Sequence, residues 1–177
     1  MKKRISLGLL AIALISVTAC NSQDKAEDKS KRPSPPAKVT QKISSGATIT
    51  IDYGQPSVKG RTIGKDLEPM DGKVWRTGAN EATTFETDKE LMVEDSKLPA
   101  GKYSLFTIFN GNDVTVIFNK TANQWGAYKY SEADDALRIK TKASDESAAS
   151  EKLNFKVDPS GLITLLWGPK KVEFPVK

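Results

Sequence analysis

Apolar and polar residues alternate along most of the chain from residue 38 onward, with the period of two that is typical of β-strands. Two such runs, residues 38–43 and 48–53, flank a Ser-Ser-Gly tripeptide, which predicts a β-hairpin. A second hairpin is predicted at Asn110 and Gly111, because both residue types tolerate the backbone of a tight turn. Further strands are predicted at residues 83–87, 91–93, 102–109, 113–118, 137–142, 153–157, 161–167 and 170–176.

No run of useful length has the 3.6-residue period of a helix, so the predicted fold class is all-β. Turn signals between short strands are typical of an antiparallel β-sandwich, and we expect about nine or ten strands in a single domain over residues 38–177. Residues 102–109 and 113–118 are apolar on both faces, as in the centre of a covered sheet. The residues expected in the core are Phe106, Ile108, Val116 and Phe118.

Three segments are expected to lie between strands. Residues 54–72 hold several glycines and prolines and are too long for a tight turn, which predicts a structured loop. Residues 144–151 are small and polar, which predicts another loop, and Gly168 with Pro169 predicts a turn between the last two strands.

Residues 1–19 have the composition of a signal peptide. Three basic residues precede an apolar run of about 13 residues, which is too short to span a membrane, for which roughly 20 are needed. Small residues end the run directly before Cys20, which resembles the lipobox of bacterial lipoproteins. Cys20 is the only Cys, so we predict that it is the lipidated, palmitate-bearing first residue of the mature protein. The alternative is an ordinary secretory signal followed by a free Cys.

Residues 20–37 are polar and charged, with three prolines and no aromatic residue, and this composition predicts a flexible tether. We therefore expect a lipid-anchored protein of the bacterial cell envelope, at the outer membrane. The composition does not decide between the periplasmic and the outer surface of that membrane. The formal net charge of the whole chain is +5, but from residue 33 onward there are 20 basic and 19 acidic residues. Because no basic cluster is visible in the folded part, nucleic-acid binding is not expected.

Residues 75–82, called the central motif below, combine side chains that no strand or helix requires. Trp75, Arg76, Asn80 and Glu81 stand close together, around a glycine that permits a sharp turn. A guanidinium, an amide and a carboxylate beside an aromatic ring could recognise a sugar or a carboxylate-bearing small molecule. The structural interpretation is that Arg76 pairs with Glu81 or a neighbour, Asn80 bonds the turn backbone and Trp75 fills the core.

Four further residues are candidates for the same site. Tyr53 and Arg61 border or lie in the irregular segment 54–72 and could reach the central motif. Trp125 and Tyr128 could form a stacking platform, although aromatic residues of a β-sandwich belong to the core more often.

The composition excludes several chemistries. The chain has no His, so a Ser-His-Asp or Cys-His nucleophile and a His-bearing zinc site are excluded, and no metal or cofactor is expected. A pair of carboxylates, as in glycosidases, is what remains for hydrolysis. The candidate carboxylates are Glu81, Asp52, Glu86 and Asp88.

Four stretches resemble the domain of unknown function 2911 family, found mainly in lipoproteins and secreted proteins of the Bacteroidetes. They are residues 56–61, 72–82, 98–106 and 125–128. The resemblance implies an all-β extracytoplasmic domain and supplies no functional residues, because the family has no established activity. We expect a non-enzymatic module that binds a small ligand or a partner protein. The alternatives are a structural envelope protein without a small-molecule site and a carboxylate-dependent hydrolase.

Overall fold

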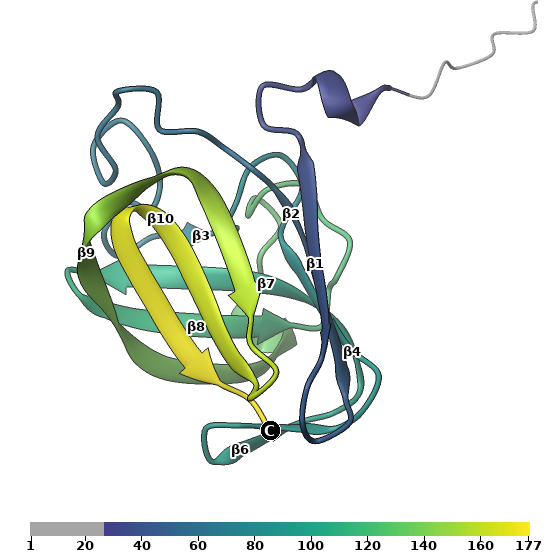
Figure 1. Ribbon diagram of the computed structural model, residues 1–177. Helices are drawn as coiled ribbons and strands as arrows, with labels where there is room; N and C mark the ends of the chain where they lie inside the picture. The colour runs from purple at the N-terminus through teal and green to yellow at the C-terminus, as the bar shows by residue number, and fades with distance from the viewer. Residues whose placement is uncertain (1–26) are drawn as a thin grey trace, which may run out of the picture.

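A computed structural model describes residues 27–177 of the chain (Figure 1). The predicted signal peptide, Cys20 and the first part of the predicted tether lie outside the described residues. The strands are β1 (Pro36–Lys42), β2 (Thr48–Gly54), β3 (Val74–Trp75), β4 (Thr84–Thr87), β5 (Leu91–Val93), β6 (Ser96–Leu98), β7 (Gly101–Asn110), β8 (Asp113–Asn119), β9 (Asp135–Val157) and β10 (Leu162–Pro175). Two short 3-10 helices, η1 (Lys29–Lys31) and η2 (Glu132–Asp134), complete the described elements.

The fold is all-β, as predicted. One antiparallel sheet has the order β1-β2-β4-β7-β8-β9-β10, and β3 also pairs with β7. Because β9 is 23 residues long, it pairs with β8 through its first part and with β10 through its second, so the sheet curls over itself (Figure 1). No helix in residues 27–177 is long and apolar enough to cross a membrane.

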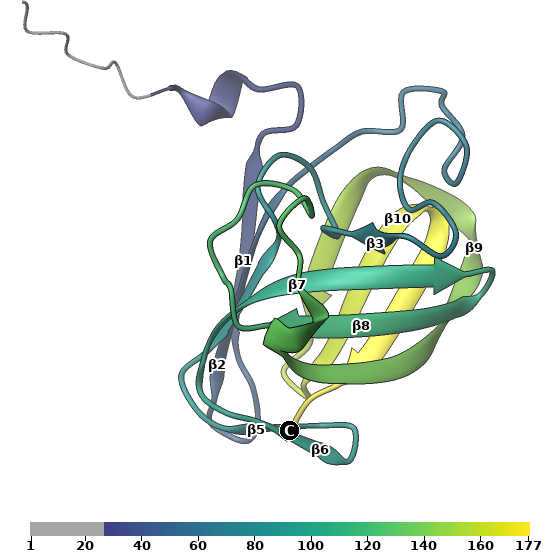
Figure 2. The ribbon, with the colours of Figure 1, turned by 180° about the vertical axis from the view of Figure 1, so that it is seen from behind.

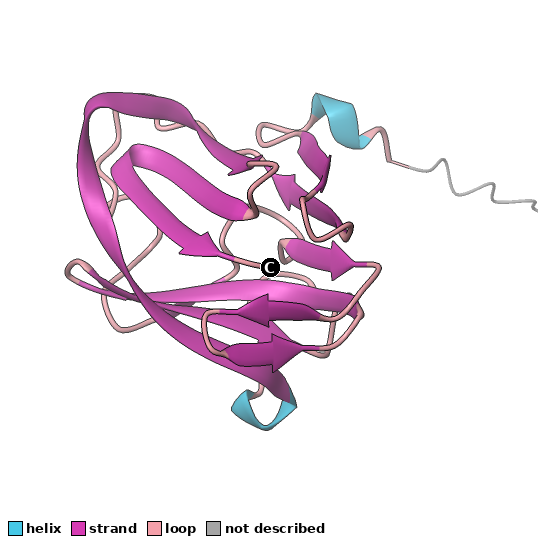
Figure 3. Ribbon diagram, turned by 60° about the horizontal axis from the view of Figure 1, so that its bottom comes forward, coloured by secondary structure: helices cyan, strands magenta, loops and turns pink. Residues whose placement is uncertain are grey.

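The short strands β5 and β6 form a separate hairpin beside the C-terminus (Figure 3). An isolated bridge between Val93 and Val176 ties this hairpin to the end of the chain. The curled sheet and the small sheet together form the sandwich-like domain that the turn spacing predicts.

The β7–β8 hairpin is covered on both faces, as its apolar pattern predicts. Phe118 and Val116 are fully buried in the main core, between the layers of the curled sheet. Phe106 is fully buried in a smaller cluster on the opposite face, where Ile108 is only partly buried. Figure 2 shows the segment after β8 crossing this outer face. Burying each large apolar side chain contributes about 1.5–3 kcal/mol, so the cover also fixes that segment in place.

Two sequence predictions about the last strands are wrong. Residues 144–151 are not a loop but the middle of β9, and the expected turn at Gly168 lies inside β10. Side chains on both faces of this part of β9 are exposed or half-buried, so the apolar alternation is lost there. The backbone ladder continues through Asp145 and Lys170, whose side chains also form an ion pair of 2.9 Å. Gly168, with φ at +56°, accommodates the irregularity in the register.

The segment between β2 and β3 is irregular, as expected, and is held by scattered backbone contacts. The Trp167 indole donates a hydrogen bond of 2.7 Å to the carbonyl of Glu68. Both ribbon views place this loop at the end of the domain where η1 lies (Figures 1 and 2). The β5–β6 hairpin lies at the opposite end.

Candidate functional site

The first half of the central motif turns inward. Trp75 is 2% exposed and packs against Phe109, with ring centres 6.3 Å apart. Its indole donates to the carbonyl of Gly78 at 3.2 Å, and the fully buried Thr77 hydroxyl contacts that of Thr107 at 3.1 Å. Trp75 therefore fills the core, and the expectation that it offers a stacking surface is not met, because no ligand can reach its ring.

A close approach between the motif and β2 depends on Gly54. The amide of Ala79 donates to the carbonyl of Gly54 at 3.2 Å. A Cβ at Gly54 would lie 2.1 Å from the carbonyl oxygen of Ala79, so only glycine fits there. The contact fixes the turn of the motif against the end of the strand, and nothing in the local sequence around Gly54 indicates it.

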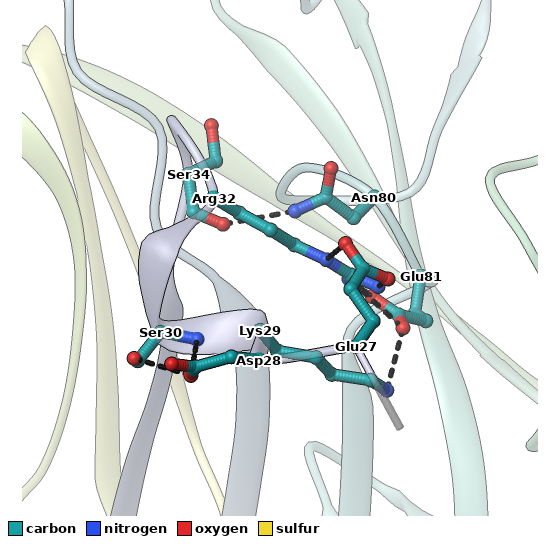
Figure 4. Close-up of polar contacts among 8 residues, drawn as sticks. All are labelled: Glu27, Asp28, Lys29, Ser30, Arg32, Ser34, Asn80 and Glu81. Carbon is teal, nitrogen blue, oxygen red and sulfur yellow. Dashed lines mark hydrogen bonds and ion pairs between the residues drawn. The ribbon is translucent and has the colours of Figure 1, made fainter. Parts of the chain in front are cut away.

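The second half of the motif reaches outward to residues 27–35, called the amino-terminal segment below. The carboxylate of Glu81 accepts hydrogen bonds from the ammonium of Lys29 and from the guanidinium of Arg32, each at 2.8 Å (Figure 4). The Asn80 amide donates to the carbonyl of Ser34 at 2.8 Å. Part of the predicted tether thus packs on the domain, and β1 begins at Pro36, inside the range assigned to the tether.

Arg32 is the centre of this contact. Its side chain is only 12% exposed and lies between two carboxylates, because Nε also donates to Glu27 at 2.9 Å. Its guanidinium lies 5.7 Å from the centre of the Trp125 ring, within the range of a cation–π contact. The hydrogen bonds that Arg32 donates to Glu27 and Glu81 raise the pKa of Arg32, so its charge is permanent.

The charge of Glu81 is equally well held. Partial burial raises the pKa of its carboxyl, but hydrogen bonds from Lys29, from backbone and from Arg32 outweigh burial and lower the pKa to about 2. Arg76 is not the partner of Glu81, so that part of the structural interpretation is wrong, whereas its expectation that Trp75 fills the core is met. The Arg76 side chain is half-buried, and its Nε has no hydrogen-bond partner among the described residues.

Residues 123–130, called the aromatic segment below, lie beside the central motif, as the candidate roles of Trp125 and Tyr128 require. Trp125 forms an isolated bridge with Glu81, and the Gly126 amide donates to the carbonyl of Asn80 at 3.1 Å. Trp125 is 55% exposed and Tyr128 is 84% exposed, so both present their rings to solvent. They meet the geometric requirement of a platform, whereas Trp75 does not.

The two remaining candidates are placed differently. The ring of Tyr53 is buried, and its hydroxyl bonds the side chain of Asn154 at 3.2 Å, although the residue also borders the pocket described next. Arg61 lies away from the motif, and its guanidinium donates to the carbonyls of Ser57 and Val58 at the rim of a different cavity. The structure does not bring Arg61 to the central motif.

A pocket of about 250 Å³ lies between the amino-terminal segment and the outer face of β1, β2 and β4. Sequence analysis missed most of its lining, since Lys29, Arg32 and Lys102 look like any surface cations. Thr84 also lines the pocket, and its hydroxyl is buried without a hydrogen-bond partner among residues 27–177. Charged side chains of both signs reach the walls. They are Lys29, Arg32, Asp52, Glu81 and Lys102.

The fold and this site define an all-β domain whose pocket has charged side chains at its walls and is closed on one side by the domain's own amino-terminal segment. The chain belongs to the family described as "Protein of unknown function (DUF2911)", whose model matches residues 34–176. The match confirms the resemblance seen in the sequence, and its range includes the central motif but neither Lys29 nor Arg32. Comparisons with curated proteins and with solved structures gave no match.

Proposed function

We propose that this protein is a non-enzymatic binding module of the bacterial cell envelope, anchored through Cys20, that holds a small polar ligand in the pocket beside Glu81. The observation that carries the proposal is the pocket itself, which is lined by charged groups of both signs. Purely structural ion pairs would not require a hollow between them.

The size and chemistry of the pocket narrow the ligand class. Small-molecule sites have volumes of roughly 300–1,000 Å³, so a pocket of about 250 Å³ suits a ligand no larger than a sugar ring or an amino acid. Its walls offer the Lys102 ammonium and the Asp52 carboxylate, which can bind hydroxyl, carboxylate and ammonium groups. The unpartnered Thr84 hydroxyl is a further unmet polar group at this wall.

The hydrolase alternative is less well supported. Asp52 and Glu81 line the same pocket, which is the arrangement that a two-carboxylate mechanism needs. A general acid must keep its proton near the working pH, which requires a raised pKa. The pKa of Glu81 is instead lowered to about 2, and Asp52 is paired with Lys38 at 3.1 Å. The lowered pKa favours a permanent charge on Glu81, which can bind a ligand but does not donate a proton.

One observation favours the structural alternative. Asn80 and Glu81 both direct their polar groups to the amino-terminal segment, so the motif fastens that segment whether or not a ligand binds. On this alternative, the segment positions the domain relative to its anchor and the pocket has no ligand.

Paired substitutions distinguish the ligand-binding function from the structural alternative. A panel of sugars, amino acids and short peptides is screened by calorimetry against the full mature chain. Lys102→Gln or Asp52→Asn should weaken any pocket ligand about tenfold, because a hydrogen bond to a charged group contributes about 1.5–3 kcal/mol. Lys97→Gln and Asp113→Asn are matched controls, since Lys97 and Asp113 are also ion-paired but lie outside the pocket. The structural alternative is correct if no panel member binds, or if pocket and control variants bind equally.

A further inference from the structure

The segment between β8 and η2 presents the two most exposed large hydrophobic side chains of the described residues. Tyr128 is 84% exposed and Trp125 is 55% exposed, whereas the other two tryptophans, Trp75 and Trp167, are 2% and 3% exposed. Exposed Trp and Tyr side chains so close in sequence are costly to leave in water, since each carries a large apolar ring. Their position therefore needs an explanation.

The segment is fixed to the sheet, so these rings point outward from a firm base. The amide of Ala82 donates to the carbonyl of Gln124 at 3.0 Å, and Gly126 bonds Asn80 from the other side. Further along, Tyr130 packs edge-on against Phe106 at 5.1 Å. The exposure of Trp125 and Tyr128 thus comes from an anchored backbone between two attachment points.

The chain enters the domain next to these rings. Arg32 lies over Trp125, and Glu27, the first described residue, pairs with Arg32 (Figure 4). Glu27 is the seventh residue after Cys20, and seven residue steps span at most about 25 Å. A domain of this size is roughly 40 Å across, from a radius of gyration of roughly 15 Å. A lipid on Cys20 would therefore keep Glu27 within about 25 Å of the bilayer, a distance shorter than the width of the domain.

Charge at this end is compatible with a phospholipid surface. Lys129 is exposed in the aromatic segment itself, and Lys59 and Lys65 are exposed in the loop that lies at the same end of the domain (Figures 1 and 2). The neighbouring carboxylates of Glu27 and Glu132 are ion-paired with Arg32 and Arg138. The same loop also carries the exposed carboxylates of Asp66 and Asp71, so this end of the domain has charges of both signs, and Lys129 is the exposed cation closest in sequence to the rings.

We propose that this end of the domain is a membrane-contacting surface, with Trp125 and Tyr128 at the headgroup level of a phospholipid bilayer. Amphipathic aromatic rings are enriched at this level, where one end of the ring is apolar and the other is hydrated. Lys59, Lys65 and Lys129 face the anionic headgroups, each contributing to a surface attraction that salt weakens. The contact orients the domain, which the lipid anchor alone does not do. The proposal rests on the lipidation of Cys20.

Tryptophan fluorescence tests this contact directly. The mature chain is purified from membranes, its acyl chains are verified by mass, and it is reconstituted into phosphatidylethanolamine–phosphatidylglycerol vesicles whose acyl chains carry bromine. Because Trp75 and Trp167 are buried, bromine quenching reports on Trp125. We expect blue-shifted emission and quenching relative to unbrominated vesicles, loss of the quenched component in Trp125→Phe, and weaker quenching in Tyr128→Ala.

A probe at the far end is the matched control. Met92, 37% exposed on β5, is replaced in a Trp125→Phe, Met92→Trp chain, whose new indole should remain unquenched. Equal quenching of wild type and Trp125→Phe, quenching at position 92, or no quenching at all would overturn the proposal. A mature chain without acyl groups would also overturn it. So would a change of Trp125 fluorescence on adding a glycan but not on adding vesicles.

Discussion

The two halves of the central motif have opposite surroundings although they are adjacent in sequence. Trp75 and Thr77 are buried and hydrogen-bonded to their own turn and to β7. Asn80 and Glu81 are partly exposed and bond a segment roughly fifty residues earlier in the chain. The inward half gives the motif a rigid base, and the outward half uses that base to hold charged groups at the pocket. A dense mixture of residue types can therefore contain a structural part and a candidate site.

The largest expected effect comes from the inward half. Trp75→Ala removes a buried ring from the main core and leaves the Thr77 and Gly78 contacts unsupported, so the free energy of unfolding should fall by about 3–5 kcal/mol. Urea denaturation followed by circular dichroism measures the change. Trp125→Ala, on an exposed ring of the same type, should cost less than about 1 kcal/mol. Similar losses for the two variants would contradict the contrast between the halves.

Removing the charge of the outward half should release the amino-terminal segment while the domain stays folded. Glu81→Gln leaves Lys29 and Arg32 without their shared carboxylate, and the exposed pairs it breaks contribute at most about 1 kcal/mol. Cleavage by trypsin after the basic residues of the segment should then be about fivefold faster, the factor that corresponds to about 1 kcal/mol. Glu86→Gln, which breaks the Lys102 pair on the same sheet, is the control and should leave cleavage unchanged.

A smaller effect is expected from acid. The pKa of Glu81 is lowered from 4.5 to about 2 in the folded protein, so its contribution to holding the segment is complete above pH 4.5 and is lost as the pH falls toward 2. Since the Glu81 side chain is 43% exposed, salt should reduce this contribution. Fluorescence of Trp125, which Arg32 covers, should show a transition in that range. A transition of equal size in Glu81→Gln would assign it to other carboxyl groups.

Much of the fold could be predicted because most strands alternate in a simple way. The β1–β2 and β7–β8 hairpins follow from β-branched runs and turn residues, and the burial of Phe118 follows from its apolar neighbours. The middle of β9 could not be predicted, because a strand with both faces exposed has no apolar period. Backbone pairing holds it, and this pairing leaves no mark in the residue types.

The site was only partly visible in the sequence. The position of the central motif was indicated by its unusual composition, but its partners were not. Arg32 lies 49 residues before Glu81 in a polar stretch, where one more cation carries no information about its partner. The pocket wall at Thr84 and Lys102 arises from the pairing of β2, β4 and β7, and such a wall is a property of the tertiary fold.

Hydrogen exchange of the amino-terminal segment tests most directly whether the outward half of the motif builds one wall of the pocket. The amides of Ser30, Lys31 and Arg32 bond Asp28 and Lys29 within the docked turn. At neutral pH they should exchange more slowly than in an unstructured peptide, and Glu81→Gln should speed their exchange about fivefold while the amides of β7 remain protected. Exchange at the unstructured rate in the wild-type protein, or protection unchanged by Glu81→Gln, would contradict the assignment of Glu81 as the residue that holds the segment.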